Sequence, residues 1–171
     1  MLDALTMKMI RYYRGDADRI QHFTKVHSYA RLIAVSEQLE PDMQFITEAA
    51  AIVHDIGIRL CEQKYGECGG KLQEIEGPAL AEKMLNELMF PSNVVERVSY
   101  LVGHHHTYDK IDGTDYQILV EADFLVNFLE GGMDKDAIRT TYEKIFKTGT
   151  GRLVCREMFG LDCASAPSSF T

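Results

Sequence analysis

Apolar residues recur every three or four positions along most of the chain, and no long segment alternates between apolar and polar residues. This spacing is typical of amphipathic helices and not of half-buried strands. The sequence therefore predicts an all-α helical bundle with almost no strand. We expect helices over residues 17–39, from Asp42 to the glycine-rich stretch 65–70, from Gly77 and Pro78 to Leu88, from Asn93 to Gly103, over 114–130, and from Lys135 to Lys147.

Residues with special backbone preferences set two of these boundaries. The pair Gly77 and Pro78 predicts a helix start, because a proline at the first helical position loses no hydrogen bond that the helix needs. The glycines of YGECGG, residues 65–70, predict a loop that ends the preceding helix. That helix includes the segment AAAIVHDIGI, which is apolar on most sides and is therefore expected to be buried.

The size and charge of the chain indicate how many domains it has and what kind of partner it binds. With 171 residues it has the length of one domain, so we expect a single domain over residues 1–171, with C-terminal helices within 134–160 and a frayed tail over 161–171. Lysine and arginine total 18 against 26 acidic residues, a net charge of −8. This charge favours a small diffusible substrate as partner over duplex nucleic acid or a membrane. The sequence leaves open whether the chain forms a homo-oligomer.

The sequence also predicts a cytoplasmic protein. Its apolar runs are too short or too interrupted to span a bilayer, and its first residues lack the pattern of a secretory signal. The cysteines show no CxxC pairing, so they are expected to be reduced thiols and not a disulfide framework or a zinc knuckle. These cysteines are Cys61, Cys68, Cys155 and Cys163.

Four polar residues interrupt segments that the helical pattern requires to be apolar. They are His27, His54, Asp55 and Asp123. A lone histidine on an apolar face is more often a hydrogen-bonded core residue than a ligand. Two histidines and two aspartates on three predicted helices, however, form a mixed nitrogen and oxygen ligand set for a divalent transition metal. A metal ion would satisfy both imidazoles and both carboxylates in an otherwise dry core.

In order and spacing, these residues resemble the H…HD…D signature of the HD-domain superfamily, with His54 and Asp55 inside VHDIG and Asp123 inside EADFL. The resemblance covers about residues 15–130. It implies a helical bundle of the HD-domain type, and most members of that superfamily are metal-dependent phosphohydrolases. It also implies that His27, His54, Asp55 and Asp123 are metal ligands, with Asp55 bridging if a second ion binds.

A histidine run at 104–106 falls where many HD proteins carry one or two histidines. The resemblance indicates His105 as the metal ligand among them, with contact to a substrate phosphate as an equal alternative. Three consecutive side chains cannot all face one pocket, so we expect at least one of them to be exposed to solvent. His104 and His106 are candidates for binding the substrate. Protonation of the leaving group is assigned to His104, His106 or a glutamate, with no choice among them.

Relatives with two metal ions usually carry a further histidine on the helix after the HD motif. Here the matching stretch offers Gln73, Glu74 and Glu76 instead. The resemblance therefore implies one divalent ion. A second ion would need the 104–106 cluster together with a glutamate.

Cationic side chains near the HD motif are candidates for holding a phosphate. The lysine that follows HD-x-G in some relatives is Ile58 here, and the neighbouring Arg59 could bind phosphate as a bidentate fork. Lys71 is a further candidate for substrate binding. Lys64 and Arg31 are weaker candidates for the same role.

Together these features predict a metal-dependent phosphohydrolase that acts on a nucleotide or another small phosphorylated metabolite through a metal-activated water. Asp55, His105 and Arg59 are assigned to catalysis, and His104, His106 and Lys71 to substrate binding. The divalent ion would be Mn, Fe, Co, Ni, Mg or Zn. Two alternatives remain open: an iron-dependent oxygenase on the same scaffold, and a non-catalytic metal-binding signalling module.

Overall fold

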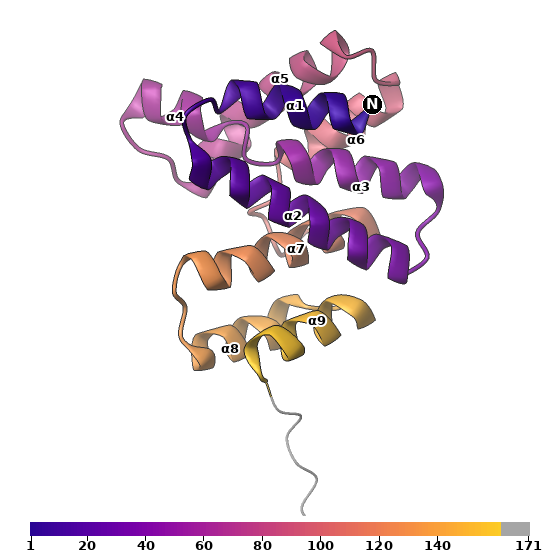
Figure 1. Cartoon of the computed structure of the whole chain (residues 1–171), viewed down its shortest axis with the longest axis vertical. Coiled ribbons are helices and arrows are strands. Elements are labelled where there is room, and N and C mark those ends of the chain that lie inside the picture. The colour runs from indigo at the N-terminus through magenta and orange to yellow at the C-terminus, as the bar shows by residue number, and fades with distance from the viewer. Residues whose placement is uncertain (162–171) are drawn as a thin grey trace, which may run out of the picture.

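The computed structural model describes residues 1–161, and these residues form nine helices and no strand (Figure 1). The prediction of an all-α fold is thereby confirmed. Residues 162–171, most of the predicted frayed tail, lie outside the described residues. The helices are α1 (Leu2–Tyr12), α2 (Ala17–Ser36), α3 (Pro41–Val53), α4 (Ile58–Tyr65), α5 (Gly70–Glu87), α6 (Ser92–Val102), α7 (Thr114–Glu130), α8 (Lys135–Ile145) and α9 (Gly149–Phe159).

The helices pack around α2 and α3, which lie side by side in the middle of the molecule (Figure 1). Helix α2 also packs against α7, and α3 packs against α1, α6 and α7. The pair α8 and α9 lies on the far side of α7, at the bottom of the view. The central helices thus carry the apolar core, and polar side chains that they point inward meet one another.

Side chains fix several helix starts. Asp16 caps α2, since its carboxylate accepts a hydrogen bond from the backbone N–H of Arg19. Asp134 caps α8, and Thr148 caps α9 through the N–H of Gly151. Each cap satisfies a backbone donor that a helix start leaves without a partner.

Two predicted helix boundaries were wrong. The helix expected to run from Asp42 to the glycine-rich stretch is broken by a turn over residues 54–57, so that α3 ends at Val53 and α4 begins at Ile58. Pro78 lies inside α5, which begins at Gly70 and not at Gly77. The first turns of α5 are formed by helix-favouring residues, and one missing backbone donor at a proline is tolerated where neighbouring helices pack against it.

Helix α1 was not predicted, although it contributes to the core. Its Leu5 and Met9 are fully buried. Just after it, Tyr13 donates a hydrogen bond from its hydroxyl to the backbone oxygen of Asp55, at 2.7 Å. The N-terminal segment is thereby fastened to the turn over residues 54–57.

A buried carboxylate fastens α7 to the C-terminal pair. Glu121, with no exposed surface, accepts hydrogen bonds from the backbone N–H groups of Lys147 and Thr148, from the Thr148 hydroxyl and from the Gln117 amide. Because a buried charge is costly unless its oxygens are satisfied, these four donors make the carboxylate tolerable. Within residues 1–161, no helix combines the length and the apolar composition that crossing a membrane requires.

Candidate metal centre

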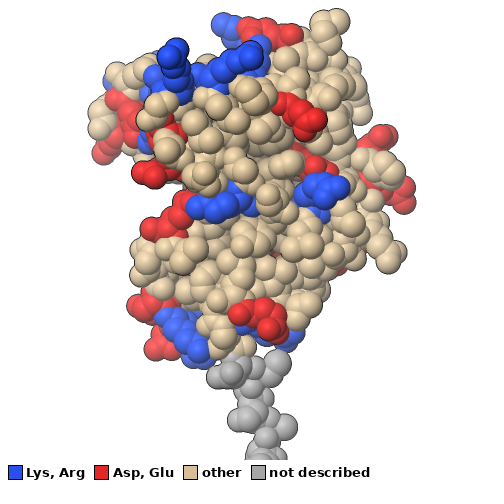
Figure 2. All heavy atoms as spheres, in the orientation of Figure 1, with Lys and Arg blue, Asp and Glu red and all other residues tan. Residues whose placement is uncertain are grey.

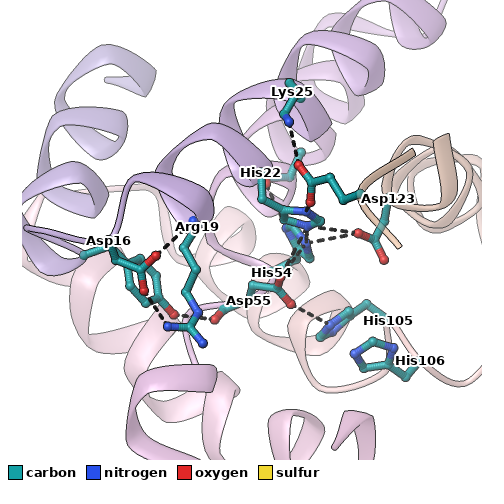
Figure 3. Close-up of polar contacts among 12 residues, drawn as sticks. Asp16, Arg19, His22, Lys25, His54, Asp55, His105, His106 and Asp123 are labelled. Carbon is teal, nitrogen blue, oxygen red and sulfur yellow. Dashed lines mark hydrogen bonds and ion pairs between the residues drawn. The ribbon is translucent and has the colours of Figure 1, made fainter. Parts of the chain in front are cut away.

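Five side chains converge from four parts of the chain (Figure 3). His22 comes from α2 and Asp123 from α7. His54 and Asp55 lie on the turn between α3 and α4, and His105 lies just after α6. Helix packing in the core therefore brings together residues that are up to about a hundred positions apart in the sequence.

The tightest group consists of His22, His54 and Asp123. The Nε2 atoms of the two histidines lie 3.2 Å apart. Asp123 Oδ1 lies 3.2 Å from His22 Nε2 and 3.5 Å from His54 Nε2. One nitrogen or oxygen atom from each of the three lies within 4.8 Å of the others, which is the spacing needed to hold one ion.

Asp55 joins this group to a second one. Its Oδ2 lies 3.3 Å from His22 Nε2 and 3.4 Å from His54 Nε2. Its Oδ1 faces the other way, 3.5 Å from His105 Nε2. Asp55, His105 and His106 form the second group whose potential ligand atoms lie within 4.8 Å of one another.

The Nδ1 atoms of His22, His54 and His105 each form a hydrogen bond with an acceptor on the side away from the centre. His54 Nδ1 donates to the backbone oxygen of Ala51 at 2.9 Å, and His105 Nδ1 donates to that of Val102 at 2.8 Å. His22 Nδ1 donates to a carboxylate oxygen of Glu130 at 2.8 Å. Because Nδ1 donates in each ring, each Nε2 faces the centre, where it carries a proton or, once that proton has left, offers its lone pair to a metal ion. Metal-binding histidines are held in this way.

Three buried atoms at the centre lack hydrogen-bond partners. They are His105 Nε2, His106 Nε2 and Asp123 Oδ1. Buried polar atoms are rarely left unpaired in proteins, so such a cluster indicates a missing partner. A cation is the partner that suits two ring nitrogens and a carboxylate oxygen together, and the residues therefore fit a divalent metal.

Burial and neighbouring charges shift the pKa values of several residues at the centre. Burial disfavours protonated His54, but the negative charge of Asp55 outweighs it and holds the pKa of His54 well above its ordinary value. Burial likewise opposes ionised Asp55, but the positive charge of His54 outweighs it and holds the pKa of Asp55 well below its usual range. Burial, together with the charge of His105, lowers the pKa of His106 to about 4, so His106 is neutral near pH 7.

A cavity of about 270 Å³ opens onto the two groups of ligand atoms. His22, Asp55 and Asp123 line it, and so do Arg19 and Gln73. Gln73 is buried, and its Oε1 has no hydrogen-bond partner. The guanidinium of Arg19 is held by Asp16 and Glu62 (Figure 3). The cavity thus offers ligand atoms, one positive charge and one free amide oxygen to a small molecule.

The structure does not bring His27 to this centre, and His22 takes the place that the sequence analysis gave it. Five residues along a helix turn the side chain by about 140°, so the two histidines flank the apolar stripe on opposite sides. His27 Nε2 lies 2.9 Å from Glu48 on α3. Periodicity alone could not choose between the two edges of the stripe. Arg19, also missed, is recognisable only through its position one turn before His22.

Three other predicted residues lie away from the cavity. Arg59 donates a hydrogen bond to the backbone oxygen of Tyr12 and lies over its ring, so it does not line the cavity. His104 stacks on Tyr100, and its Nδ1 donates to the backbone oxygen of Tyr100. Lys71 is exposed.

The two remaining cationic candidates are engaged elsewhere. Lys64 pairs with Glu76, and Arg31 lies 3.8 Å from Glu48. His106, in contrast, does line the cavity beside the metal-ligand groups. Of the three residues predicted to bind the substrate, the structure brings His106 to the cavity and leaves His104 and Lys71 away from it.

Comparisons with known proteins concern the family and the fold. A family model described as the HD domain matches residues 19–147. The crystal structure of a predicted HD superfamily hydrolase from an uncultured Thermotogales bacterium shares the fold, with a TM-score of 0.64 and 24% sequence identity; the match covers 93% of this chain and 83% of that one. No curated protein matches the sequence. Since the family match spans most of the chain, the protein belongs to the HD-domain family.

Proposed function

We propose that this protein is a metal-dependent phosphohydrolase that cleaves a small phosphorylated metabolite or nucleotide. The observation that carries the proposal is the set of Nε2 lone pairs of His22, His54 and His105, each fixed by a hydrogen bond on the opposite ring nitrogen and each aimed at a carboxylate. A bound cation would satisfy these buried nitrogens and carboxylates together.

The ligand atoms support a site for one or two ions. His22, His54 and Asp123 would hold the first ion, with Asp55 Oδ2 beside them. Asp55 Oδ1, His105 and His106 would hold a second, so that Asp55 would bridge the two. Mixed imidazole and carboxylate ligands suit Mn, Fe, Co, Ni and Zn, and Mg less well.

The chemistry supplied by a bound divalent ion is a water of lowered pKa and a polarised phosphoryl oxygen. The chain's own residues would do the rest. Arg19 faces the cavity as a fixed positive charge, oriented by Asp16 and Glu62, and would hold a phosphoryl oxygen. Gln73 Oε1 would accept a hydrogen bond from the substrate or from a water molecule. His106, whose pKa is lowered to about 4, is neutral near pH 7 and would not serve as the acid that protonates the leaving group.

The cavity also supports the choice of substrate class. Its volume of about 270 Å³ suits a phosphate group and the part of a small molecule next to it. With a net charge of −8, the chain is a poor partner for duplex nucleic acid or an anionic membrane. A small phosphorylated substrate is therefore the partner that we propose.

The test is phosphate release from a panel of nucleotides and sugar phosphates, with Mn, Co, Mg, Ni, Fe or Zn supplied in turn. Asp55→Asn removes a charge that faces both ligand groups, and we expect it to lower metal-stimulated release by at least about a hundredfold. Asp109→Asn is the matched control, since Asp109 is exposed on the loop after α6. Full activity in Asp55→Asn would refute the proposed centre.

The same experiment separates the alternatives. Oxygen consumption by the iron-loaded protein without phosphate release would favour an oxygenase. Tight metal binding with neither activity, together with a large loss of stability on chelation, would favour a non-catalytic metal-binding module.

A further inference from the structure

A second depression lies beside the metal centre and shares Arg19 with it. Its volume is about 450 Å³, and Arg14, Arg19 and Arg59 contribute three guanidinium groups to its walls. On the face shown in Figure 2, Lys and Arg side chains gather over α1 at the top of the view, and Arg14 follows the end of that helix. Three arginines around one hollow are a marked concentration in a chain of net charge −8.

The three guanidinium groups are held to different degrees. Arg19 is fixed by Asp16 and by Glu62, whose oxygen lies 2.6 Å from Nη2. Arg59 uses Nη1 to bond the backbone oxygen of Tyr12 and leaves its other donors unused. The Arg14 side chain is exposed and has no hydrogen bond or ion pair to any residue that the structure describes.

The two hollows have opposite charge. The metal cavity is lined by the carboxylates of Asp18, Asp55, Asp123 and Glu130 and by a single arginine. The second depression has three arginines against the two carboxylates of Asp16 and Glu62. A cation therefore belongs in the first hollow and an anion in the second, with Arg19 standing between them.

We propose that the depression lined by Arg14, Arg19 and Arg59 binds a second phosphate group of the substrate, while the first phosphate group lies at the metal centre. This inference rests on the proposed function, because it names the substrate class of the same site: a small molecule with two phosphate groups. Arginine suits this role, since its planar fork of donors matches phosphate oxygens in pairs. Exposed Arg14 can turn toward the ligand without breaking a hydrogen bond or ion pair.

The test compares the binding of inorganic pyrophosphate and inorganic phosphate to the full-length chain, by titration calorimetry in excess Mn²⁺. We expect the wild-type protein to bind pyrophosphate at least about tenfold more tightly than phosphate. In the double variant Arg14→Gln, Arg59→Gln this ratio should fall to near one. Arg139→Gln is the matched control, because Arg139 is a partly exposed arginine on α8 that pairs with Asp136, and it should keep the wild-type ratio.

Two results would overturn the inference: a wild-type ratio near one, or a ratio that the double variant leaves unchanged. If the double variant unfolds, Arg14→Gln alone decides, because Arg14 makes no side-chain contact that the fold depends on. A different result would refute the proposed function. A protein that prefers pyrophosphate through these arginines but releases no phosphate from any compound would retain the second anion site and refute the hydrolase.

Discussion

His22 and His54 point their Nε2 atoms at one another across 3.2 Å, although they lie on different elements and neither ring can turn away. Each ring is held from behind, His22 by Glu130 and His54 by the backbone oxygen of Ala51. Two facing lone pairs repel unless a proton or a metal ion lies between them. The pair is thus arranged around a positive charge.

Replacing His22 therefore tests the ligand assignment directly. We expect His22→Ala to weaken metal binding by about a hundredfold or more, measured by calorimetry or by metal content after gel filtration. His27→Ala should leave metal binding unchanged, because His27 contacts Glu48 and not the centre. Equal loss in both variants would contradict the assignment.

Gly70 controls the position of His106. A Cβ atom at residue 70 would lie 2.7 Å from Cγ of the His106 ring, closer than side chains tolerate. We expect Gly70→Ala to displace this ring and to change KM for phosphate release by about tenfold, with a smaller change in melting temperature. Gly69→Ala is the control, since a Cβ there would meet nothing within 4 Å. Identical kinetics in the two variants would show that His106 does not serve the substrate.

The fold could be predicted from the sequence to the extent that periodicity determines it. The apolar stripe of α2 and the long apolar run of α7 predict buried helices, and both are present. The break after Val53 was not predicted, because the apolar residues Val53, Ile56 and Leu60 keep helical spacing across the turn. Helix α1 was missed because no signal marks its ends.

The site could be predicted only in part, for a geometric reason. His54, Asp55 and Asp123 interrupt strongly apolar segments, so their burial is visible in the sequence, and the structure brings them together. His22 and His27 both border the stripe of α2, and only the packing of α7 and α3 against opposite edges decides which one meets the aspartates. The spacing of residues within one helix does not show which residues of other helices they contact.

Arg97 holds the loop after the histidine run through two carboxylates. It forms paired hydrogen bonds with the buried Asp115 and with the more exposed Asp112. We expect Arg97→Gln to lower the free energy of unfolding by about 2–4 kcal/mol at pH 7, because buried Asp115 would lose its paired arginine hydrogen bonds and keep the one from the backbone N–H of Tyr116. Urea unfolding at several pH values would measure this.

The pH dependence of that loss has a definite sign. The hydrogen bonds from Arg97 lower the pKa of Asp112 in the folded protein. Its contribution to stability is therefore present above the unfolded pKa of about 4 and is lost as the pH falls through the folded value. The difference between wild type and Arg97→Gln should narrow below pH 4. A difference that widens there would contradict the account.

The Glu121 network leaves no space at Gly151. A Cβ atom at residue 151 would lie 1.9 Å from Glu121 Oε2 and 2.7 Å from Thr148 Oγ1. We expect Gly151→Ala to cost about 2–4 kcal/mol, since the buried carboxylate would lose donors, and thermal unfolding should show it as a drop of about 5–15 °C. Gly149→Ala, whose Cβ would approach Glu37 only to 3.4 Å, should change stability by no more than about 0.5 kcal/mol.

The carboxylate of Glu121 also limits where the chain can be truncated in a recombinant fragment. The region that matches the family ends at residue 147, one position before Thr148, which supplies two of the four donors to this carboxylate. A recombinant fragment trimmed to the family boundary would expose a carboxylate two residues before Asp123 on the same helix. A fragment that ends at the family boundary would therefore destabilise the part of α7 that carries the metal ligand Asp123. A usable fragment has to extend through α9.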